Sequence, residues 1–262
     1  MNFNNHAITL TYGDQAENHK GMEKIGQMAD SGFTLADLQT CKQRFEQTGN
    51  VCELIHLNQY LPAQLADGST ADPAYVLVVR GGVNTLLRSI NRTADDLYTE
   101  QVNLTWDAKA LMYGRVVNKH ARHNLCYSDY AQEPDYEEGK GRVYNFNSVP
   151  LTKHIREQLP NYLPNSAGLQ CEGNHYYDIN KCGISYHIDS ERLKVVGARI
   201  GASNPLHYNW YFAGQPVGTK CQLIINHGDL YVMDEMAKGI SWKRKNKYDL
   251  RHAAGCPKYT DI

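Results

Sequence analysis

The sequence lacks several features that would assign the protein to a class at once. It has no run of about 18 apolar residues and no apolar core near its N-terminus, so we expect no membrane association and no signal peptide. Its seven cysteines form no C-x-x-C pair, which argues against a zinc site or a disulfide framework. Reduced thiols instead favour an intracellular, cytoplasmic location.

Net charge is nearly absent as well. The 27 Lys and Arg residues are balanced by 28 Asp and Glu residues, so no overall basic field indicates a nucleic-acid-binding protein. A nucleic-acid partner would therefore have to meet a local basic patch. With 262 residues, of which 42% are hydrophobic, the chain is long enough for one large domain or two small ones.

A histidine and an aspartate stand two residues apart in the segment 184–191. If this segment is a strand, His187 and Asp189 point to the same side, because side chains alternate along a strand. Together with a third ligand they would hold three positions of an octahedral metal and leave the others open, as in non-haem Fe(II) oxygenases. The alternative interpretation is a pair of surface residues on an ordinary strand.

The residues that follow this pair read as short strands bounded by Gly, Pro, Asn or Asp. A histidine–carboxylate site at the start of such a series indicates a β-barrel or jelly-roll metal enzyme. The expected strands are 194–202, 207–213, 221–226, 229–233, 240–243 and 248–253.

Residues 1–105 read instead as a mixture of helices and short strands. Helices are expected over 22–28, 35–47 and 89–97, and a buried strand over 75–79. Thr34, with Asp37 three residues later, is typical of a helix N-cap. This part of the chain contains no evident catalytic pattern.

A basic segment lies between the two parts. Arg115, Lys119 and Arg122 stand close together, and Tyr127 and Tyr130 follow them. Basic groups interleaved with aromatic rings are suited to phosphate contact and base stacking. An ordinary solvated strand–loop–strand explains the segment equally well.

Four motifs, in this order, resemble the AlkB-like branch of the Fe(II)/2-oxoglutarate dioxygenases. They are Asn174-His175-Tyr176, His187-Ile188-Asp189 with Glu191, His227-Gly228-Asp229 and Tyr248-Asp249-Leu250-Arg251. The resemblance covers residues 112–258 and is nearest to proteins of large DNA viruses and their algal or protist hosts. A viral protein of this kind would act in the cytoplasm or nucleus of its host.

The resemblance implies a fold and cofactors. The fold class would be α+β, with a double-stranded β-helix (jelly-roll) dioxygenase domain over residues 106–262 and an N-terminal mixed α/β extension over 1–105. His187 and Asp189 would be catalytic and bind Fe(II). Asn174, Tyr176 and Arg251 would bind the co-substrate 2-oxoglutarate, and molecular oxygen would be the second co-substrate.

The third metal ligand departs from the family pattern, because residues 228–251 contain no histidine. His252 is the preferred candidate, although it is adjacent to Arg251 and should face the opposite side of a strand. We therefore expect a break in the strand alternation near residue 251. Either His252 is the third ligand, with Arg251 turned aside and a lysine or another arginine binding the co-substrate, or Arg251 binds the co-substrate and the triad is incomplete. His227 is a further candidate for the ligand, but a structural role in its turn is favoured.

The resemblance implies hydroxylation or oxidative demethylation of a base in DNA or RNA. Glu191 and Arg192 could orient such a substrate and Trp210 could stack on it, although a strand-end ion pair and core packing also explain these residues. The same chemistry on a protein side chain or small molecule is an alternative. A degenerate, non-catalytic binding module is another.

Overall fold

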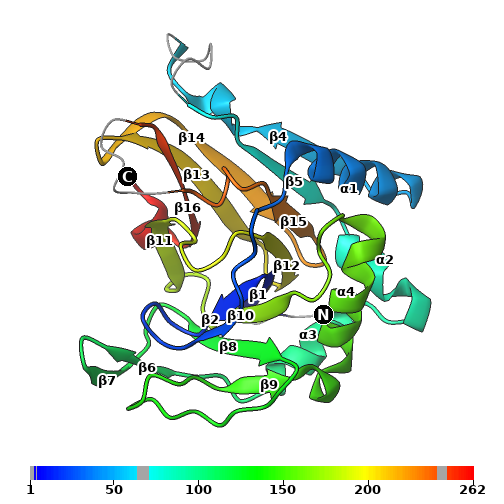
Figure 1. The fold of residues 1–262 in the computed structure, drawn as a ribbon, viewed down its shortest axis with the longest axis vertical. Helices are drawn as coiled ribbons and strands as arrows, with labels where there is room; N and C mark the ends of the chain where they lie inside the picture. Colours follow the sequence, from blue (N-terminus) through cyan, green and yellow to red (C-terminus); the bar gives the residue numbers. More distant parts are fainter. Residues whose placement is uncertain (1–2, 4, 64–70, 241–246) are drawn as a thin grey trace.

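Two β-sheets and a layer of helices build the protein (Figure 1). The computed structural model describes residues 3, 5–63, 71–240 and 247–262. One sheet has eight strands and the other has four, and nearly all neighbouring strands are antiparallel; β8 and β9 are parallel. The fold class is therefore α+β, as the sequence predicted. Among the described residues, no helix has both the length and the apolar character needed to cross a membrane.

The bounds of the elements follow the order of the sheets. The large sheet consists of β4 (Cys52–His56), β5 (Tyr75–Val79), β15 (Leu230–Met233), β12 (Val195–Gly201), β1 (Ala7–Gly13), β10 (Gln170–Tyr176), β8 (His123–Ser128) and β9 (Val143–Asn145). The small sheet consists of β11 (Gly183–His187), β16 (Asp249–Gly255), β13 (Asn204–Phe212) and β14 (Gln215–Ile225). Two separate pairs are β2 (Gln15–Glu17) with β3 (Lys24–Gly26), and β6 (Lys109–Met112) with β7 (Arg115–Asn118).

The helices α1 to α4 lie on the outer face of the large sheet (Figure 1). They are α1 (Leu35–Gln47), α2 (Gly82–Leu87), α3 (Ala94–Val102) and α4 (Pro150–Tyr162), with a short α5 (Pro257–Thr260) beside β11 and β16. The 3-10 turns are η1 (Leu57–Tyr60), η3 (Arg88–Ile90) and η4 (Phe146–Ser148).

Alternation along the strands divides the apolar core into two layers. On β5, Leu77 and Val79 pack with the helices, whereas Val76 and Val78 pack with residues of the small sheet. Both faces of β5 are thus covered, which is why its sequence is a continuous apolar run and not an alternating one. The large sheet is consequently the middle layer, and its inner face looks toward the small sheet.

Several local predictions are confirmed. Helix α1 spans the expected residues 35–47, and Thr34 and Asp37 form a reciprocal capping box at its start. Such a cap contributes about 1 kcal/mol, because it satisfies amide groups that have no partner within the helix. The strand expected over 75–79 is β5.

Other local predictions need correction. Residues 22–28 are not helical, because Lys24–Gly26 pair with β2 and bury Ile25. The helix expected over 89–97 is divided at Asn91, whose φ of 54° ends η3 before α3 begins. Five strands expected after the His-x-Asp pair match β12 to β16. The strand expected over 240–243 lies, apart from Ile240, outside the described residues.

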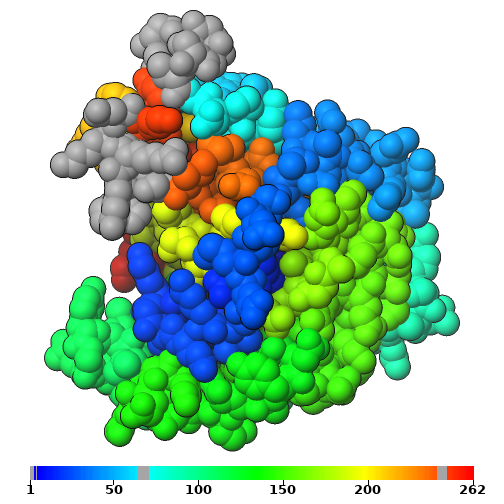
Figure 2. Space-filling view, in the orientation of Figure 1, coloured from blue at the N-terminus to red at the C-terminus, as the bar shows by residue number. Residues whose placement is uncertain are grey.

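Strand β1 occupies the centre of the large sheet, between β10 and β12. It is antiparallel to both, with Thr9 opposite Asn174 on one side and Arg199 on the other. The division expected at residues 105/106 therefore runs through one sheet, since β1, β4 and β5 pair with strands of the second part or with each other. Figure 2 shows the dark blue N-terminal residues at the centre of this face, bordered by green segments below and by yellow and orange segments above.

Candidate metal centre

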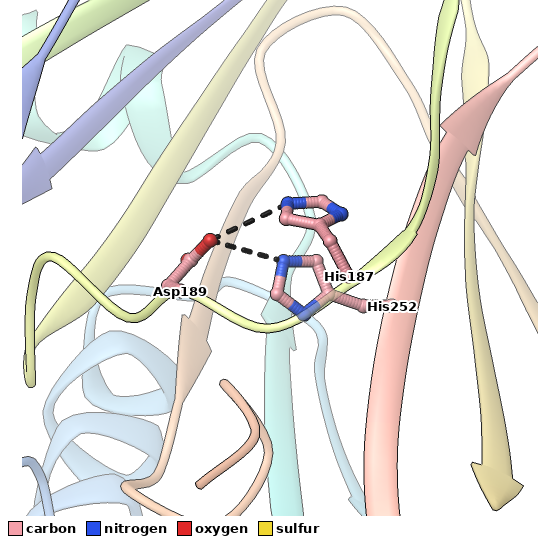
Figure 3. Close-up of side chains that lie close together, drawn as sticks. All are labelled: His187, Asp189 and His252. Atoms are coloured by element: carbon pink, nitrogen blue, oxygen red, sulfur yellow. Dashed lines mark ion pairs between the residues drawn. The ribbon is translucent and has the colours of Figure 1, made fainter. Parts of the chain in front are cut away.

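Three side chains converge at the inner side of the small sheet. The ligand atoms of His187, Asp189 and His252 all lie within 4.8 Å of one another. The Asp189 Oδ1 atom is 3.4 Å from Nε2 of His187 and 3.5 Å from Nε2 of His252. Figure 3 shows both imidazoles turned toward this oxygen. The structure therefore brings together the three residues that the sequence singled out as metal ligands.

A β-bulge in β11 aims His187 at its partners. His187 pairs with His252 and Ile184 pairs with Ala254, so three steps along β11 match two along β16. The extra residue shifts the register, as bulges beside functional sites commonly do. The irregularity expected near residue 251 thus occurs in β11, and β16 keeps its alternation. Asp189 lies just beyond the end of β11, and not on the strand as expected.

A turn at Lys238 and Gly239, which follows β15, holds Asp189 in place. The Asp189 amide donates to the Lys238 carbonyl at 3.0 Å, and the buried Lys238 ammonium donates back to the Asp189 carbonyl at 3.3 Å. Gly239 has φ of +85°, and a Cβ there would lie 2.2 Å from Ile188. Only glycine fits this approach, so the turn and the carboxylate are positioned together.

The site favours an ionised Asp189 carboxylate and a neutral His252 imidazole. Burial raises the pKa of Asp189, but His252 and His187 outweigh this effect and hold its pKa well below the usual range. Burial, reinforced by His187, lowers the pKa of His252. The Nδ1 atom of His187 is 2.8 Å from the Ser185 carbonyl, which favours the tautomer that leaves Nε2 free as a ligand. These are the protonation states that metal binding needs.

The spacing of the three groups fits one divalent ion. Cis ligands at about 2.1 Å from an octahedral metal lie about 3.0 Å apart. The observed separations of 3.4 and 3.5 Å are close to this value. The triad could therefore bind a metal ion on one face and leave the opposite positions open to the cavity.

A cavity of about 280 Å³ extends from the triad between the two sheets. The large sheet contributes Thr9 and Thr11 of β1, Arg199 of β12 and Tyr231 of β15 to its wall. Gly197 lies beside Tyr231, and a Cβ at this position would lie 2.0 Å from the phenol ring. The missing side chain at Gly197 thus lets the Tyr231 ring lie against the sheet.

Asn174 and Tyr176 line this cavity, as their predicted role requires. The side-chain oxygen Oδ1 of Asn174 accepts hydrogen bonds from Arg122 Nε at 2.6 Å and from Asn124 Nδ2 at 2.8 Å. The side-chain nitrogen Nδ2 of Asn174 donates a hydrogen bond to the Glu172 carboxylate at 2.9 Å. Asn174 is therefore already occupied by protein partners. Its role as a co-substrate ligand stays a prediction.

Arg251 does not reach the cavity, which corrects the prediction that it binds the co-substrate. Its neighbour His252 faces the triad, so Arg251 faces the other side of β16. There its guanidinium lies 4.1 Å from the Tyr211 ring centroid and donates to Asp249 at 3.0 Å. Arg199, for which the sequence predicted no role, lines the cavity instead. No local motif marks this arginine, since it lies in an apolar strand.

Glu191 and Arg192 belong to a buried ionic network that also lines the cavity. Arg192 is 3% exposed and pairs with Glu172 and with Glu191, the latter at 2.8 Å. Burial raises the pKa of Glu191, with Arg192 opposing and Asp189 adding to the effect. This network is more than the simple strand-end pair considered from the sequence, because Glu172 comes from β10 in the large sheet.

The basic segment does not form one surface. Arg115 is exposed on β7, and Arg122 lines the cavity. Lys119 is buried and donates to Asn18 at 2.6 Å and to Asn124 at 3.0 Å, so it is not available for phosphate contact. Burial lowers the pKa of Lys119 to about 8.

Two further candidates have structural roles. Trp210 is 1% exposed in the core between the sheets and donates its indole N–H to the Leu57 carbonyl at 2.9 Å, so it cannot stack on a substrate. His227 accepts from the Gly201 amide at 2.9 Å and stacks on Phe3, away from the triad.

Comparison with known proteins identifies a viral relative. No protein-family model matches the chain. The chain is 44% identical over 252 residues to the uncharacterized protein R156 of Acanthamoeba polyphaga mimivirus, and the match covers 96% of each chain. Identity at this level over nearly the whole length is a family relationship. The chain therefore belongs to the same protein family as R156 of Acanthamoeba polyphaga mimivirus.

Proposed function

We propose that the protein is an Fe(II)- and 2-oxoglutarate-dependent dioxygenase. The observation that carries this proposal is the convergence of His187, Asp189 and His252 at the wall of a cavity between two sheets. Two imidazoles and one carboxylate on one face of a metal, with the remaining positions open, are the ligand set of non-haem Fe(II) oxygenases.

The order of the strands supports a double-stranded β-helix for the core. From β10 onward the chain passes between the large and the small sheet in the order large, small, large, small, small, large, small. Strand β1 adds an eighth strand, between β10 and β12 in the large sheet. Eight antiparallel strands in two facing sheets are the number expected for a jelly roll. We infer that the N-terminal strand closes this one.

The residues around the triad would serve the reaction in distinct ways. Bound Fe(II) would supply activation of oxygen, driven by decarboxylation of the 2-oxo acid, for insertion of an oxygen atom into a C–H bond. His187, Asp189 and His252 would hold the metal in a fixed orientation, which the Ser185 carbonyl and the Lys238 turn support. The buried walls formed by Tyr231 and the threonines of β1 would limit access of water to the reacting groups.

The dioxygenase proposal is tested under anaerobic conditions with Fe(II). Adding 2-oxoglutarate to the Fe(II)-loaded protein should produce a metal-to-ligand charge-transfer absorption band. Admitting oxygen should then yield succinate. The Asp189→Ala variant is the matched control and should give neither signal. A wild-type protein that binds no Fe(II), or binds it without responding to 2-oxoglutarate, would exclude this function and favour a non-catalytic binding module.

We propose a base in DNA or RNA as the substrate. The support is local. The β6–β7 hairpin projects from the body of the protein (Figure 1). It carries the exposed Arg115 and, in its turn, Tyr113, which is 94% exposed. A cationic group next to an exposed ring is suited to contacting a phosphate and stacking on a base. The ionic network of Glu172, Glu191 and Arg192 offers both hydrogen-bond acceptors and donors within the cavity.

A salt series with a single-stranded oligonucleotide tests the substrate class. Replacing Arg115 by Gln should weaken binding and lower the slope of log K against log salt by about one unit. Arg88, exposed beside α2, is the control, and Arg88→Gln should leave the slope unchanged. Equal slopes for Arg115→Gln and the wild type would favour a protein side chain or small molecule as substrate.

A further inference from the structure

Arg199 is buried in the interior of the protein with unsatisfied donors. It lies on β12 and is 1% exposed, yet its Nε and Nη1 atoms have no hydrogen-bond partner among the described residues. A buried guanidinium without a counter-charge is unfavourable, because it loses its hydration and gains nothing in return. An anionic ligand in the cavity would supply the partners that these donors lack.

Its surroundings contain rings and a hydroxyl instead of a carboxylate. Thr9, directly opposite Arg199 on β1, is 3% exposed, and its hydroxyl also has no partner in the described part of the chain. The Tyr176 ring centroid lies 5.6 Å from the guanidinium. Burial lowers the pKa of Arg199, and only Tyr176 and Tyr231 oppose this effect. Thr9 and Arg199 thus form a pair of adjacent donors that face the same cavity.

The other two arginines of the cavity wall are already occupied. Arg192 is paired with Glu172 and Glu191. Arg122 donates its Nε to the Asn174 side chain at 2.6 Å and is partly exposed. Among the three arginines that line the cavity, Arg199 is therefore the one that is both fully buried and without a described partner.

The same cavity connects Arg199 to the metal triad. Both His252 and Arg199 line it, from the small and the large sheet respectively. Tyr231 of β15 lines the same cavity. A ligand that touches the triad at one end can therefore place its other end between the sheets, at β1 and β12.

We propose that Arg199 and Thr9 bind the distal carboxylate of a 2-oxo dicarboxylic acid whose keto-acid end reaches the metal. This inference rests on the proposed dioxygenase function. It places the co-substrate anchor, meaning the pair Arg199 and Thr9 that binds the distal carboxylate, on β12 and β1. A guanidinium pairs bidentately with a carboxylate, and the neighbouring hydroxyl donates a further hydrogen bond. The anchor therefore lies on the sheet opposite β16, which carries Arg251.

The experiment compares two ligands that differ only at the distal end. 2-Oxoglutarate has a carboxylate there, and 2-oxopentanoate has a methyl group. Binding of each is measured calorimetrically with protein loaded with Mn(II), so that no turnover is needed. Arg199→Gln should weaken 2-oxoglutarate binding about 10- to 100-fold, and should leave 2-oxopentanoate binding within about twofold. Arg199→Lys should weaken 2-oxoglutarate binding less than Arg199→Gln does, because the lysine keeps the positive charge.

Arg251→Gln is the matched control, because it removes the guanidinium that the sequence placed at the co-substrate, which lies on the small sheet and outside the cavity lining. It should change neither affinity beyond about twofold. If Arg199→Gln fails to fold, Arg199→Lys and Thr9→Val provide the same comparison. Equal losses for both ligands, or a selective loss in Arg251→Gln alone, would overturn the assignment to Arg199. A wild-type protein that binds neither ligand in the presence of Mn(II) would overturn the dioxygenase proposal itself, and the anchor with it.

Discussion

Two groups of histidines in this protein have opposite environments. His187 and His252 face the Asp189 carboxylate at the wall of a cavity. His6, His123 and His175 instead cluster with one another, with the His6 and His175 ring nitrogens 3.2 Å apart. Around this second group, which we call the imidazole cluster, lie the rings of Trp106 and Tyr177.

The difference shows that neighbouring side chains, and not residue type alone, distinguish a candidate metal site from a packed group of histidines. Within the described ranges, the triad is the group of three ligand residues whose donor atoms lie within 4.8 Å of one another. The imidazole cluster has aromatic neighbours and the basic Lys119 nearby, and burial lowers the pKa of His123 and, with His6 and His123, the pKa of His175, the latter to about 3. Both shifts favour the neutral forms of His123 and His175 in the folded protein.

Removing one imidazole from each group gives the sharpest test of this contrast. His252→Ala should weaken divalent-metal binding more than about 100-fold, since even changes beyond the direct ligands cost 10- to 100-fold. His175→Phe should leave metal affinity within about twofold. Calorimetric titration with Co(II) measures both. A large loss of metal affinity in His175→Phe would mean that the imidazole cluster contributes to the metal site.

Moving the carboxylate without replacing it tests the geometry of the triad. Gly239→Ala introduces a Cβ that would collide with Ile188, next to Asp189, at a φ of +85°. We expect metal affinity to fall about tenfold, because the turn that orients the ligand must shift. Gly214→Ala is the control, since that glycine also has a positive φ but nothing within 4 Å of the added carbon. Equal metal affinities in the two variants would show that this turn does not position Asp189.

The imidazole cluster should determine part of the acid sensitivity. The folded-state pKa of His175, about 3, lies below its ordinary value of 6.5, so the unfolded chain binds an extra proton between these values. Stability should therefore fall as pH falls from about 6.5 toward 3, by at most about 1.4 kcal/mol per pH unit from this residue.

Urea unfolding of the wild type and His175→Phe between pH 7 and pH 5 measures this contribution. The variant should lose less stability on acidification, while the triad, present in both proteins, cancels from the comparison. Identical pH slopes would show that His175 binds the same number of protons in the folded and unfolded states over this range, and would contradict the lowered pKa.

Local sequence patterns were sufficient to predict some of the helices and strands, including strands that carry the candidate site. The capping box at Thr34 and Asp37 depends on residues three positions apart, so it could be predicted without knowledge of the fold. The His-x-Asp pair and the strands after it were likewise visible, because period-2 patterns and turn residues act within a few positions. The helix expected over residues 22–28 failed, since pairing of β3 with β2 prevailed over a short apolar pattern.

The same local patterns could not predict whether an arginine or lysine is buried, or which face of a sheet it occupies. Lys119 has the polar sequence surroundings of a surface residue, yet it is buried against Asn18, about a hundred positions away. Arg251 was expected at the co-substrate, but the bulge that sets the register lies in β11, and alternation in β16 turns Arg251 away. Which side of a sheet a residue faces depends on the partner strand, and a one-residue shift reverses it.

The sequence by itself determined that a histidine and a carboxylate stand two residues apart before a series of strands, and that His252 was the remaining candidate ligand. Only the tertiary structure decided that these three groups meet, and that Thr9 and Arg199 form the opposite wall of their cavity. The physical reason is the distance along the chain. Strand β1 pairs with β10 and β12, more than 150 residues later, and no pattern within β1 specifies those partners.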